Sequence, residues 1–303
     1  MPRWLTLITI SVLLSPPVLA RDIYVNNLGG DDSFDGSAPQ SRGQRSGPCR
    51  SIGRALRLAT KGDRVIVANT GEAYHESITL QGGRHSGYAS KSFEVLGNGA
   101  ILDGSQPVPA DAWEHVKDEL FRFEPKLKSF QQLFIDDLPV ERLRIPADGK
   151  MPKLEPLQWC LFQRYIYFHV ERGLLPQDYN ITYAGHPVGI TLYEVRNVVI
   201  RDVTVQGFQL DGINAHDNAM SATIVGCICR GNGRSGISVG GASRVRLQSC
   251  LVGNNGDAQV RTEGYSKTWI VDCDLLDNTA PKIVREAGRV FVEKTAAADP
   301  GTD

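Results

Sequence analysis

Regularly spaced cysteines in the last third of the chain constrain the fold more than any other feature. Cys227, Cys250 and Cys273 are each separated by 23 residues. Two columns of aliphatic residues repeat with steps of 24, 23 and 23 residues. The first column is Ile200, Ile224, Leu247 and Ile270, and the second is Ile213, Ile237, Val260 and Ile283. A further column of asparagines comprises Asn232, Asn255 and Asn278. This part of the chain is therefore a structural repeat.

A period in the low twenties excludes the helical repeats of 33 residues or more, and the leucine spacing of leucine-rich repeats is absent. Two β-branched strands per unit, with Gly-Asn turns between them, predict a right-handed parallel β-helix whose coils stack about 4.8 Å apart. The asparagines would then bond one another and the turn backbone. The cysteines would form an inward stack. Their spacing permits a disulfide, but reduced and packed thiols are the simpler interpretation.

The first third of the chain fits the same solenoid. Residues 22–25 form a predicted strand, and residues 51–59 carry apolar side chains at helical spacing behind Ser51, a good N-cap. A helix there would cover the exposed end of the first coil, as stacked repeats require. Further strands are predicted at 64–67, 77–80, 93–96 and 100–102. We therefore predict an N-terminal cap and the first coils at 21–104.

The repeat stops between residues 105 and 185. Residues 133–140 have the pattern of a hairpin with an Asp-Asp turn, and residues 159–162 and 165–168 are predicted strands. We predict an inserted, mainly β subdomain at 105–185, coils at 186–293 and a disordered tail at 294–303. The predicted fold class is all-β: a right-handed parallel β-helix with an N-terminal capping helix and an inserted β subdomain.

The first twenty residues have the features of a secretory signal peptide. Arg3 precedes a short apolar run at 4–14, and small residues precede Arg21. A run this short is not a membrane span, and no later segment is long and apolar enough to be one. We expect a mature monomer that begins at Arg21 and is secreted, or located in the periplasm or the cell envelope.

Composition and spacing exclude several other classes. The 33 Lys and Arg against 34 Asp and Glu leave no basic surplus for nucleic-acid binding. Six cysteines are too sparse for a disulfide scaffold in a chain of 303 residues. The acidic loop at 31–36 lacks the final glutamate of a calcium loop, which is replaced by Arg42. No Cys or His cluster has zinc spacing, so we predict no metal site and no cofactor.

Three stretches resemble secreted right-handed parallel β-helix proteins of the pectate-lyase-like superfamily. The segments at 23–36 and 51–65 are similar to their opening segment, and the coils from Asn197 onward match their generic repeat. The insertion, with 133–136 and 165–168, resembles one found in some β-helix glycoside hydrolases. That superfamily contains lyases, hydrolases, esterases and non-enzymes, so the resemblance implies the fold but no single reaction.

Two site motifs of that superfamily are only partly present. The LDGIN segment around Asp211 resembles the first acidic motif of polygalacturonases, which implies a catalytic carboxylate, but Gly233 and Arg234 replace the paired Asp expected one coil later. We therefore interpret Asp211 as a turn residue before a strand. Calcium-dependent lyases of this fold use a Lys base with an Arg and clustered acidic ligands. Lys282 and Arg261 lie on adjacent predicted coils without such a cluster, so calcium would be a cofactor only if the chain is a lyase.

Strand alternation places two glutamates in one outward column. If Ile283 points inward, Glu263 and Glu286 point outward, and their separation of 23 residues stacks one above the other. Retaining glycosidases use carboxyl groups about 5 Å apart, one as nucleophile and the other as acid/base. Like charges this close raise the pKa of one group and supply a proton donor. The same alternation turns Arg285 inward, and burial of its charge is unfavourable. The direction in which the side chains of the last coil face therefore stays open.

Neighbouring side chains on this predicted face suit sugar binding. Arg261 would bind a sugar hydroxyl or a uronate carboxylate, and Tyr265 would stack on a sugar ring. His216, Asn214 and Lys282 are placed on the same face. A solvated sheet face also carries such residues without any function, and this alternative stays open.

We predict a secreted β-helix protein that acts on a polysaccharide or oligosaccharide, as a glycoside hydrolase with Glu263 and Glu286 as the catalytic pair. Two alternatives remain: a polysaccharide lyase, and a non-catalytic carbohydrate-binding or envelope protein of the same fold. In each case a parallel sheet face offers a long, shallow groove with polar side chains at fixed spacing, which suits an extended sugar chain.

Overall fold

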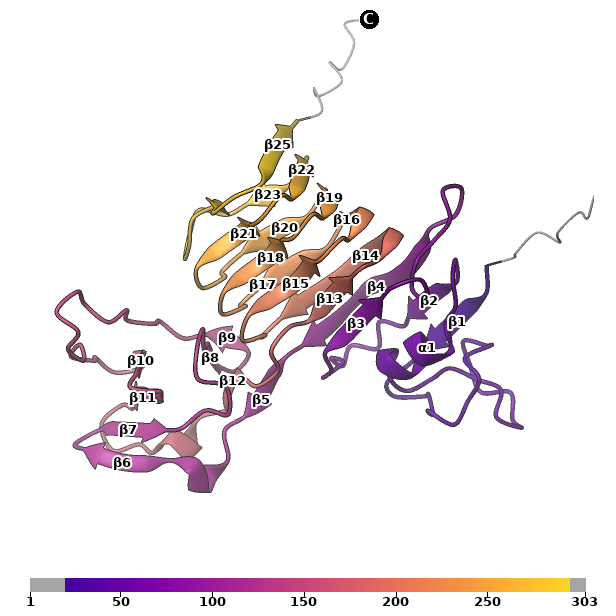
Figure 1. Ribbon diagram of the computed structural model, residues 1–303. Helices are drawn as coiled ribbons and strands as arrows, with labels where there is room; N and C mark the ends of the chain where they lie inside the picture. Colours follow the sequence, from indigo (N-terminus) through magenta and orange to yellow (C-terminus); the bar gives the residue numbers. More distant parts are fainter. Residues whose placement is uncertain (1–19, 295–303) are drawn as a thin grey trace, which may run out of the picture.

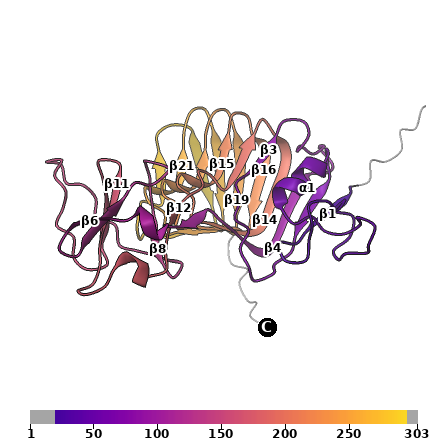
Figure 2. The same ribbon diagram turned by 90° about the horizontal axis from the view of Figure 1, so that it is seen from below.

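The computed structural model describes residues 20–294. Apart from residues 20 and 294, the predicted signal peptide (1–20) and tail (294–303) lie outside this range. Within it, the chain forms a solenoid of stacked coils with a helix near its N-terminal end and an inserted β-rich segment that projects to one side (Figures 1 and 2). None of the helices within residues 20–294 is long and apolar enough to cross a membrane.

Two parallel sheets run along the solenoid. The first sheet has the order β1-β2-β4-β14-β16-β19-β22-β25, and the short strands β17, β20 and β23 continue it round a bend from the end of β14. The second sheet has the order β3-β13-β15-β18-β21-β24. Most neighbours in each sheet come from successive coils of the chain, which is the arrangement of a parallel β-helix.

The bounds of these strands are as follows. The first sheet contains β1 (Asp22–Val25), β2 (Arg64–Val67), β4 (Phe93–Asp103), β14 (Arg196–Gln206), β16 (Met220–Val225), β19 (Arg244–Gln248), β22 (Lys267–Val271) and β25 (Arg289–Glu293), with β17 (Ile228–Arg230), β20 (Leu251–Gly253) and β23 (Asp274–Leu275) at its bend. The second sheet contains β3 (Ile78–Gln81), β13 (Ile190–Tyr193), β15 (Asp211–His216), β18 (Ser235–Val239), β21 (Ala258–Thr262) and β24 (Ile283–Arg285).

The register predicted from the aliphatic columns is confirmed. In the first sheet Ile224 pairs with Ile200 on one side and with Leu247 on the other. In the second sheet Val260 pairs with Ile283 of the last coil. All members of both columns except Ile283 are buried in one continuous hydrophobic core that fills the solenoid. Burial of these side chains, at about 25 cal/mol per Å² of apolar area, is the main stabilising term of the fold.

In the last coil, inward and outward side chains alternate as the predicted glutamate column requires. Ile283 is partly buried and packs against the core. Arg285 is exposed, and its Nε donates to the carbonyl of Gly288 at 2.9 Å. Arg285 is not forced into the core, because β24 ends at this residue and the chain turns there toward Gly288.

The predicted cysteine column stacks inside the solenoid beside the bend of the first sheet. The amide of Cys250 donates to Sγ of Cys273 at 3.4 Å, and Cys227 and Cys250 are both buried. All six cysteines lie within the described residues and are free. The hydrogen bond with Cys227 and burial raise the pKa of Cys250 to about 12. The column is therefore packed as free thiols.

The asparagine column forms only in part as predicted. The amide nitrogen and Nδ2 of Asn232 both donate to Oδ1 of Asn255 at 3.0 Å. The third member is offset, because Nδ2 of Asn278 donates to Asn254 at 2.6 Å. Gln259 fills the gap: it accepts from Nδ2 of Asn255 at 2.8 Å and donates to Asn278 at 3.3 Å. Each buried amide thus has a partner on the next coil or within its own turn.

The predicted capping helix is α1 (Ile52–Leu58), and it covers the N-terminal end of the core. Ser51 is its N-cap, as predicted. The carboxylate of Glu76 accepts from the first two amides of the helix at 2.7 and 2.8 Å. Burial raises the pKa of Glu76 despite these bonds. Two backbone donors that a helix N-terminus leaves free are therefore satisfied by the segment preceding β3.

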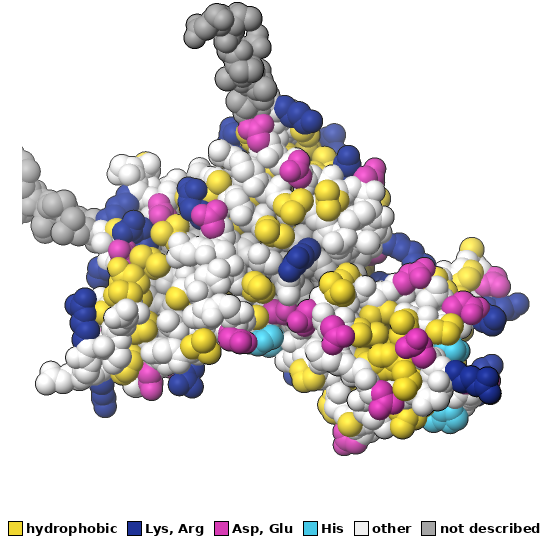
Figure 3. All heavy atoms as spheres, turned by 180° about the vertical axis from the view of Figure 1, so that it is seen from behind, with side chains coloured by type: hydrophobic (Ala, Val, Ile, Leu, Met, Phe, Trp, Pro, Cys, Tyr) yellow, Lys and Arg dark blue, Asp and Glu magenta, His cyan; other side chains and the backbone are white. Residues whose placement is uncertain are grey.

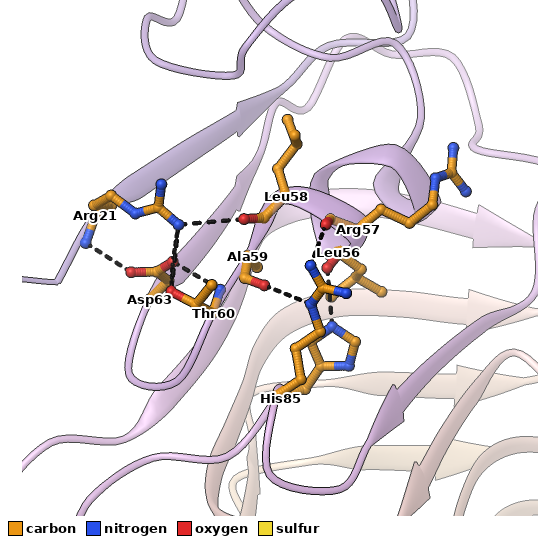
Figure 4. A network of polar contacts seen from close by, with 9 residues as sticks. Arg21, Leu56, Arg57, Leu58, Ala59, Thr60, Asp63 and His85 are labelled. Carbon is orange, nitrogen blue, oxygen red and sulfur yellow. Dashed lines mark hydrogen bonds and ion pairs between the residues drawn. The ribbon is translucent and has the colours of Figure 1, made fainter.

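The last carbonyls of α1 are bound by side chains from the turn after β3 (Figure 4). Arg84 donates to two of them, and Nε2 of His85 lies 2.9 Å from the carbonyl oxygen of Leu56. Because a carbonyl only accepts, Nε2 carries the ring proton, while Nδ1 accepts from the amide of Gln81 at 2.9 Å. His85 is therefore held as the neutral imidazole. In the same network, Asp63 accepts from the amide and from Nη2 of Arg21 at 3.1 and 2.7 Å.

The insertion consists of two four-stranded sheets, in the orders β10-β11-β7-β6 and β5-β12-β8-β9. Its elements are β5 (Ser105–Pro107), η1 (Ala110–Ala112), β6 (Glu114–Lys117), β7 (Leu120–Phe123), β8 (Leu133–Ile135), β9 (Leu138–Pro139), β10 (Trp159–Phe162), β11 (Tyr165–His169), η2 (Pro176–Asp178) and β12 (Ile181–Ala184). The predicted hairpin at 133–140 forms, and its Asp136-Asp137 turn has φ angles of 49° and 62°. The two predicted strands at 159–162 and 165–168 are β10 and β11, which pair with each other. Hydrophobic side chains gather on the rear surface of this insertion (Figure 3).

We predict that protonation of His85 destabilises the cap. Burial lowers the pKa of His85, so the unfolded chain binds a proton at a higher pH than the folded protein does. The free energy of unfolding should therefore fall as the pH drops below about 6.5, by up to about 1.4 kcal/mol per pH unit. Urea denaturation between pH 7 and pH 5 should show a shallower loss in His85→Gln than in the wild type. His115→Gln, which changes an exposed histidine of β6, is the control and should keep the wild-type slope.

Candidate functional site

Two polar columns run across the outer face of the second sheet, which we call the polar face. Their members come from successive coils and alternate with the buried residues of each strand. The first column is Thr79, Thr191, Asn214, Ser238 and Arg261. The second column is Gln81, Tyr193, His216, Gly240, Glu263 and Glu286. Its last three members each follow directly after the last paired residue of their strand. The backbone bonds Glu263 N to Val239 O and Glu286 N to Thr262 O, at 2.9 and 3.1 Å, continue the ladder through those positions.

A notch interrupts the second column at Gly240. A Cβ atom on Gly240 would lie 3.7 Å from Nε2 of His216 and 3.8 Å from Oε2 of Glu263. The two side chains therefore approach Gly240 from the coils on either side, and the missing side chain leaves a notch the size of one methyl group between them. Nδ1 of His216 lies 2.8 Å from Oδ2 of Asp217, so the carboxylate holds Nδ1 and leaves Nε2 directed at the notch.

Each of the two predicted catalytic glutamates faces an arginine. Nη1 of Arg234 is 3.9 Å from Oε1 of Glu263. Arg261 forms an ion pair with Glu286. The carboxylates lie on adjacent coils in the predicted column, and the charges along the face alternate in sign. The side chain of Glu286 is 54% exposed and that of Glu263 is 29% exposed, so both remain open to a ligand.

Asp211 is fully buried, and its role differs from the one inferred from sequence. It is the first residue of β15 and not a turn residue. Arg234 binds its carboxylate through Nε at 3.0 Å and through Nη2, and the Ser235 hydroxyl and Nδ2 of Asn214 also donate to it. The sequence placed an arginine where polygalacturonases have an acid, and that arginine neutralises Asp211. The hydrogen bonds with Asp211 raise the pKa of Arg234.

The remaining predicted binding residues are dispersed. Asn214 is committed to Asp211 through Nδ2, and its Oδ1 is buried without a partner. Tyr265 is 91% exposed just beyond β21. Lys282 is exposed, and its carbonyl accepts from the amide of Val260 at 3.0 Å. The structure thus brings Arg261, His216 and the glutamates together on one face and leaves Tyr265 and Lys282 at its margin.

Tyr193 is a member of the polar face that the sequence analysis missed. It pairs in register with His216 and is 36% exposed. The signal was present, since Ile190 precedes Ile213 by 23 residues, as Tyr193 precedes His216. The aliphatic column therefore extends one coil further toward the insertion than the repeat that was recognised.

The insertion is fixed beside the start of this face. Nη2 of Arg144 donates to the carbonyl of Gly256 at 2.7 Å and lies 3.2 Å from Oδ1 of Asp257. Gly233 has no room for a side chain, because a Cβ atom would lie 1.5 Å from the carbonyl oxygen of Phe130. The inserted loop therefore packs directly on the turns that lead into β18 and β21, and it borders one side of the polar face.

No group of three or more His, Cys, Asp and Glu side chains gathers as a metal site anywhere in residues 20–294. The acidic loop near Asp31 is a hydrogen-bonded turn instead. Asp31 accepts from the amide of Ser33 at 2.7 Å, and Asp35 accepts from the amide and hydroxyl of Ser37 at 2.9 and 2.7 Å.

Comparison with known proteins agrees with this architecture. Residues 177–295 match the family model described as the right-handed β-helix region. The fold is a right-handed parallel β-helix. A solved structure described as a glycoside hydrolase superposes on this β-helix with a TM-score of 0.60 at 10% identity, covering 84% of this chain and 73% of the other. A search among curated proteins gives no match to this sequence.

Two further solved structures are more distant from this β-helix. One, described as the complex of XylC with xylose, has a TM-score of 0.41 at 10% identity and covers 90% of this chain and 70% of its own. The other, described as pectate lyase Pel9A, has a TM-score of 0.29 at 9% identity and covers 92% and 79%.

We predict that the Asp211–Arg234 pair stabilises the coils under the polar face. Arg234→Met would leave the buried Asp211 carboxylate without its cation, which should lower the free energy of unfolding by about 3 kcal/mol. The double variant Asp211→Asn with Arg234→Met should recover part of that loss, because the buried charge is gone. Chemical denaturation measures both effects.

The control for this prediction is Lys153→Met, which removes an exposed ion pair with Glu155. That change should cost less than about 1 kcal/mol. An Arg234→Met variant as stable as Lys153→Met would show that Arg234 does not compensate a buried charge.

Proposed function

We propose that this chain is an exported glycoside hydrolase that binds a polysaccharide along the polar face and cleaves it with Glu263 and Glu286. The observation that carries the proposal is the common register of the two glutamates on adjacent coils. Adjacent parallel strands lie about 4.8 Å apart, and retaining glycosidases place their two carboxyl groups about 5–5.5 Å apart.

The polar face suits an extended sugar chain. Hydroxyl, amide, imidazole and guanidinium groups recur along it at the spacing of the coils, so successive sugar units would meet equivalent partners. Tyr193 and Tyr265 add exposed aromatic rings at its two ends, and such rings pack against the apolar faces of sugars. The glycoside hydrolase with the similar fold supports the same class of substrate.

The notch at Gly240 suggests which glutamate is the nucleophile and which is the acid/base. Glu263 borders the notch, so its carboxylate would attack an anomeric carbon seated there and form a glycosyl ester. Glu286, once released from Arg261 and protonated from solvent, would give that proton to the departing oxygen, and would then take a proton from the water that hydrolyses the ester. Its ion pair with Arg261 must open for this step. The pair is only partly exposed, with the Arg261 side chain at 12% and that of Glu286 at 54%, so substrate binding must offset its loss.

One observation favours elimination as a second candidate reaction. Asp217 orients His216 with Nε2 free at the notch, which is the arrangement of a general base. His216 would remove the proton next to the carboxylate of a uronate unit, while Arg261 neutralised that carboxylate. The bond to the leaving oxygen would then break and leave a double bond in the sugar. A glycan-binding protein without catalytic activity would use the same face.

We predict that Glu263→Gln and Glu286→Gln each lower kcat by at least about a hundredfold on the glycan that the wild type cleaves. The first change removes the nucleophile, and the second removes general acid–base catalysis, which supplies about 10² to 10⁴. Purified protein should first be screened against neutral and acidic glycans, with new reducing ends and the absorbance of unsaturated products as separate readouts. Affinity measured by calorimetry should be retained in both variants. Glu293→Gln, on the first sheet, is the control and should keep full activity.

Retention of the anomeric configuration in the first product would support the carboxylate pair. Full activity in either glutamate variant would overturn it. Unsaturated products, lost in His216→Ala, would establish elimination instead. Absence of any turnover, with glycan affinity weakened in Tyr193→Ala and Tyr265→Ala, would make the protein a binding module.

We also predict that the notch itself is required. Gly240→Val would fill it, and the added Cβ would meet only side chains, at 3.4 Å or more, so the coil should still form. The expected result is a loss of kcat/KM of tenfold or more with an unchanged thermal midpoint. Gly83→Val is the matched control, because a Cβ on Gly83 meets nothing within 4 Å and lies in the turn after β3. Equal activity of the two glycine variants would remove the notch from the mechanism.

A further inference from the structure

A second cavity lies on the other side of the coil turns, between the insertion and the bend of the first sheet. Its volume is about 210 Å³. The β8–β9 hairpin and β12 form one wall, and the ends of β4, β14 and β17 form the other. Its lining is Asp103, Ser105, Phe134, Asp137, Leu138, Pro139, Thr182, Gln206, Gly207, Arg230, Gly231 and Asn254. None of these residues belongs to the polar face, and the mechanism proposed above does not use them.

Two glycines shape this cavity. Gly207 has a φ of +74°, and a Cβ atom there would lie 2.6 Å from Oδ1 of Asp103. Gly231 has a φ of +63°, and a Cβ atom there would lie 3.1 Å from Cε1 of Phe134. Both positions therefore favour glycine for two reasons: the backbone has a positive φ, and there is little room for a side chain. They let a carboxylate and an aromatic ring approach the coil backbone closely.

A chain of hydrogen bonds fixes the polar groups of the cavity. Oδ1 of Asp103 accepts from the amide of Ser105 at 2.7 Å, and Oδ2 accepts from Nε2 of Gln206 at 2.8 Å. Oε1 of Gln206 in turn accepts from Nε of Arg230 at 2.9 Å. The Nη groups of Arg230 have no hydrogen-bond partner among residues 20–294. The cavity thus holds a buried acceptor, Asp103, and a free donor, Arg230, at set positions.

This combination matches the chemistry of a neutral sugar. Each sugar hydroxyl both donates and accepts, so vicinal hydroxyls can give a hydrogen bond to Asp103 and take one from Arg230. Phe134, Leu138 and Pro139 supply the apolar surface against which a sugar ring packs. The cavity lining contains two carboxylates, Asp103 and Asp137, and one guanidinium, that of Arg230. This excess of negative charge disfavours an anionic sugar.

We propose that this cavity binds a single neutral sugar residue, as a carbohydrate site separate from the polar face. Its volume is below the range of about 300–1,000 Å³ typical of pockets for drug-sized ligands, which suits one ring and not an oligosaccharide. The proposal does not depend on hydrolysis by Glu263 and Glu286, because the two sites share no residue.

The test is binding of methyl glycosides of neutral pentoses and hexoses to the full-length protein, measured by saturation-transfer NMR and calorimetry, with galacturonate as the anionic comparison. Arg230→Met and Asp103→Asn should each weaken binding of the neutral glycoside at least about tenfold, because hydrogen bonds to charged groups are lost. Arg201→Met, which changes an exposed arginine of β14 outside the cavity lining, is the matched control and should bind like the wild type. Circular dichroism and the thermal midpoint check that each variant is folded.

Glu263→Gln should bind the neutral glycoside like the wild type, which separates this site from the polar face. The proposal is overturned if the wild type binds no neutral glycoside, if galacturonate binds more tightly, or if folded Arg230→Met and Asp103→Asn bind as well as Arg201→Met. Loss of binding in Glu263→Gln with retention in Arg230→Met would place the sugar on the polar face instead.

Discussion

Parallel backbone pairing between one coil and the next is the constraint on which the rest of the structure depends. Each strand must keep the register of the strand below it, because a shift of one residue would turn every following side chain of the strand to the opposite face. Val260 and Ile283 can therefore both face the core only if Glu263 and Glu286 share an outward column. The same rule that fills the solenoid with aliphatic side chains thus fixes the spacing of its surface groups.

Stacking also concentrates polar groups where water cannot reach them. The coil turns bury amides that the aliphatic core cannot satisfy, and Asn232, Asn255 and Gln259 supply the partners. Asp211 is a more demanding case, since a fully buried carboxylate needs a cation as well as hydrogen bonds. Arg234 meets that need and also extends to Glu263. Stability under the polar face and the charge of its central glutamate are therefore linked through one guanidinium.

Features that recur in every coil could be predicted from the sequence, whereas contacts that occur only once could not. The aliphatic columns, the phase of β15 to β24, the helix behind Ser51 and the hairpin at 133–140 follow from local patterns and a fixed period, and the structure confirms them. The ion pair of Arg261 with Glu286 was not foreseen, because column membership says nothing about side-chain rotamers. The cavity at Asp103 and Arg230 was missed for a different reason: it forms only where the non-repeating insertion docks on the coils, and no period encodes that contact.

The docking of the insertion explains why this short solenoid can hold distinct sites on its different faces. A bare sheet face is shallow, so a ligand there keeps most of its water. The insertion adds a wall at the turns before β18 and β21, through Arg144 and Phe130, and encloses a cavity on the other side of those turns with the β8–β9 hairpin. Extended chains suit the open face, and single rings suit the enclosed cavity. One inserted segment therefore gives a uniform scaffold an open face and an enclosed cavity without altering the coil register beneath it.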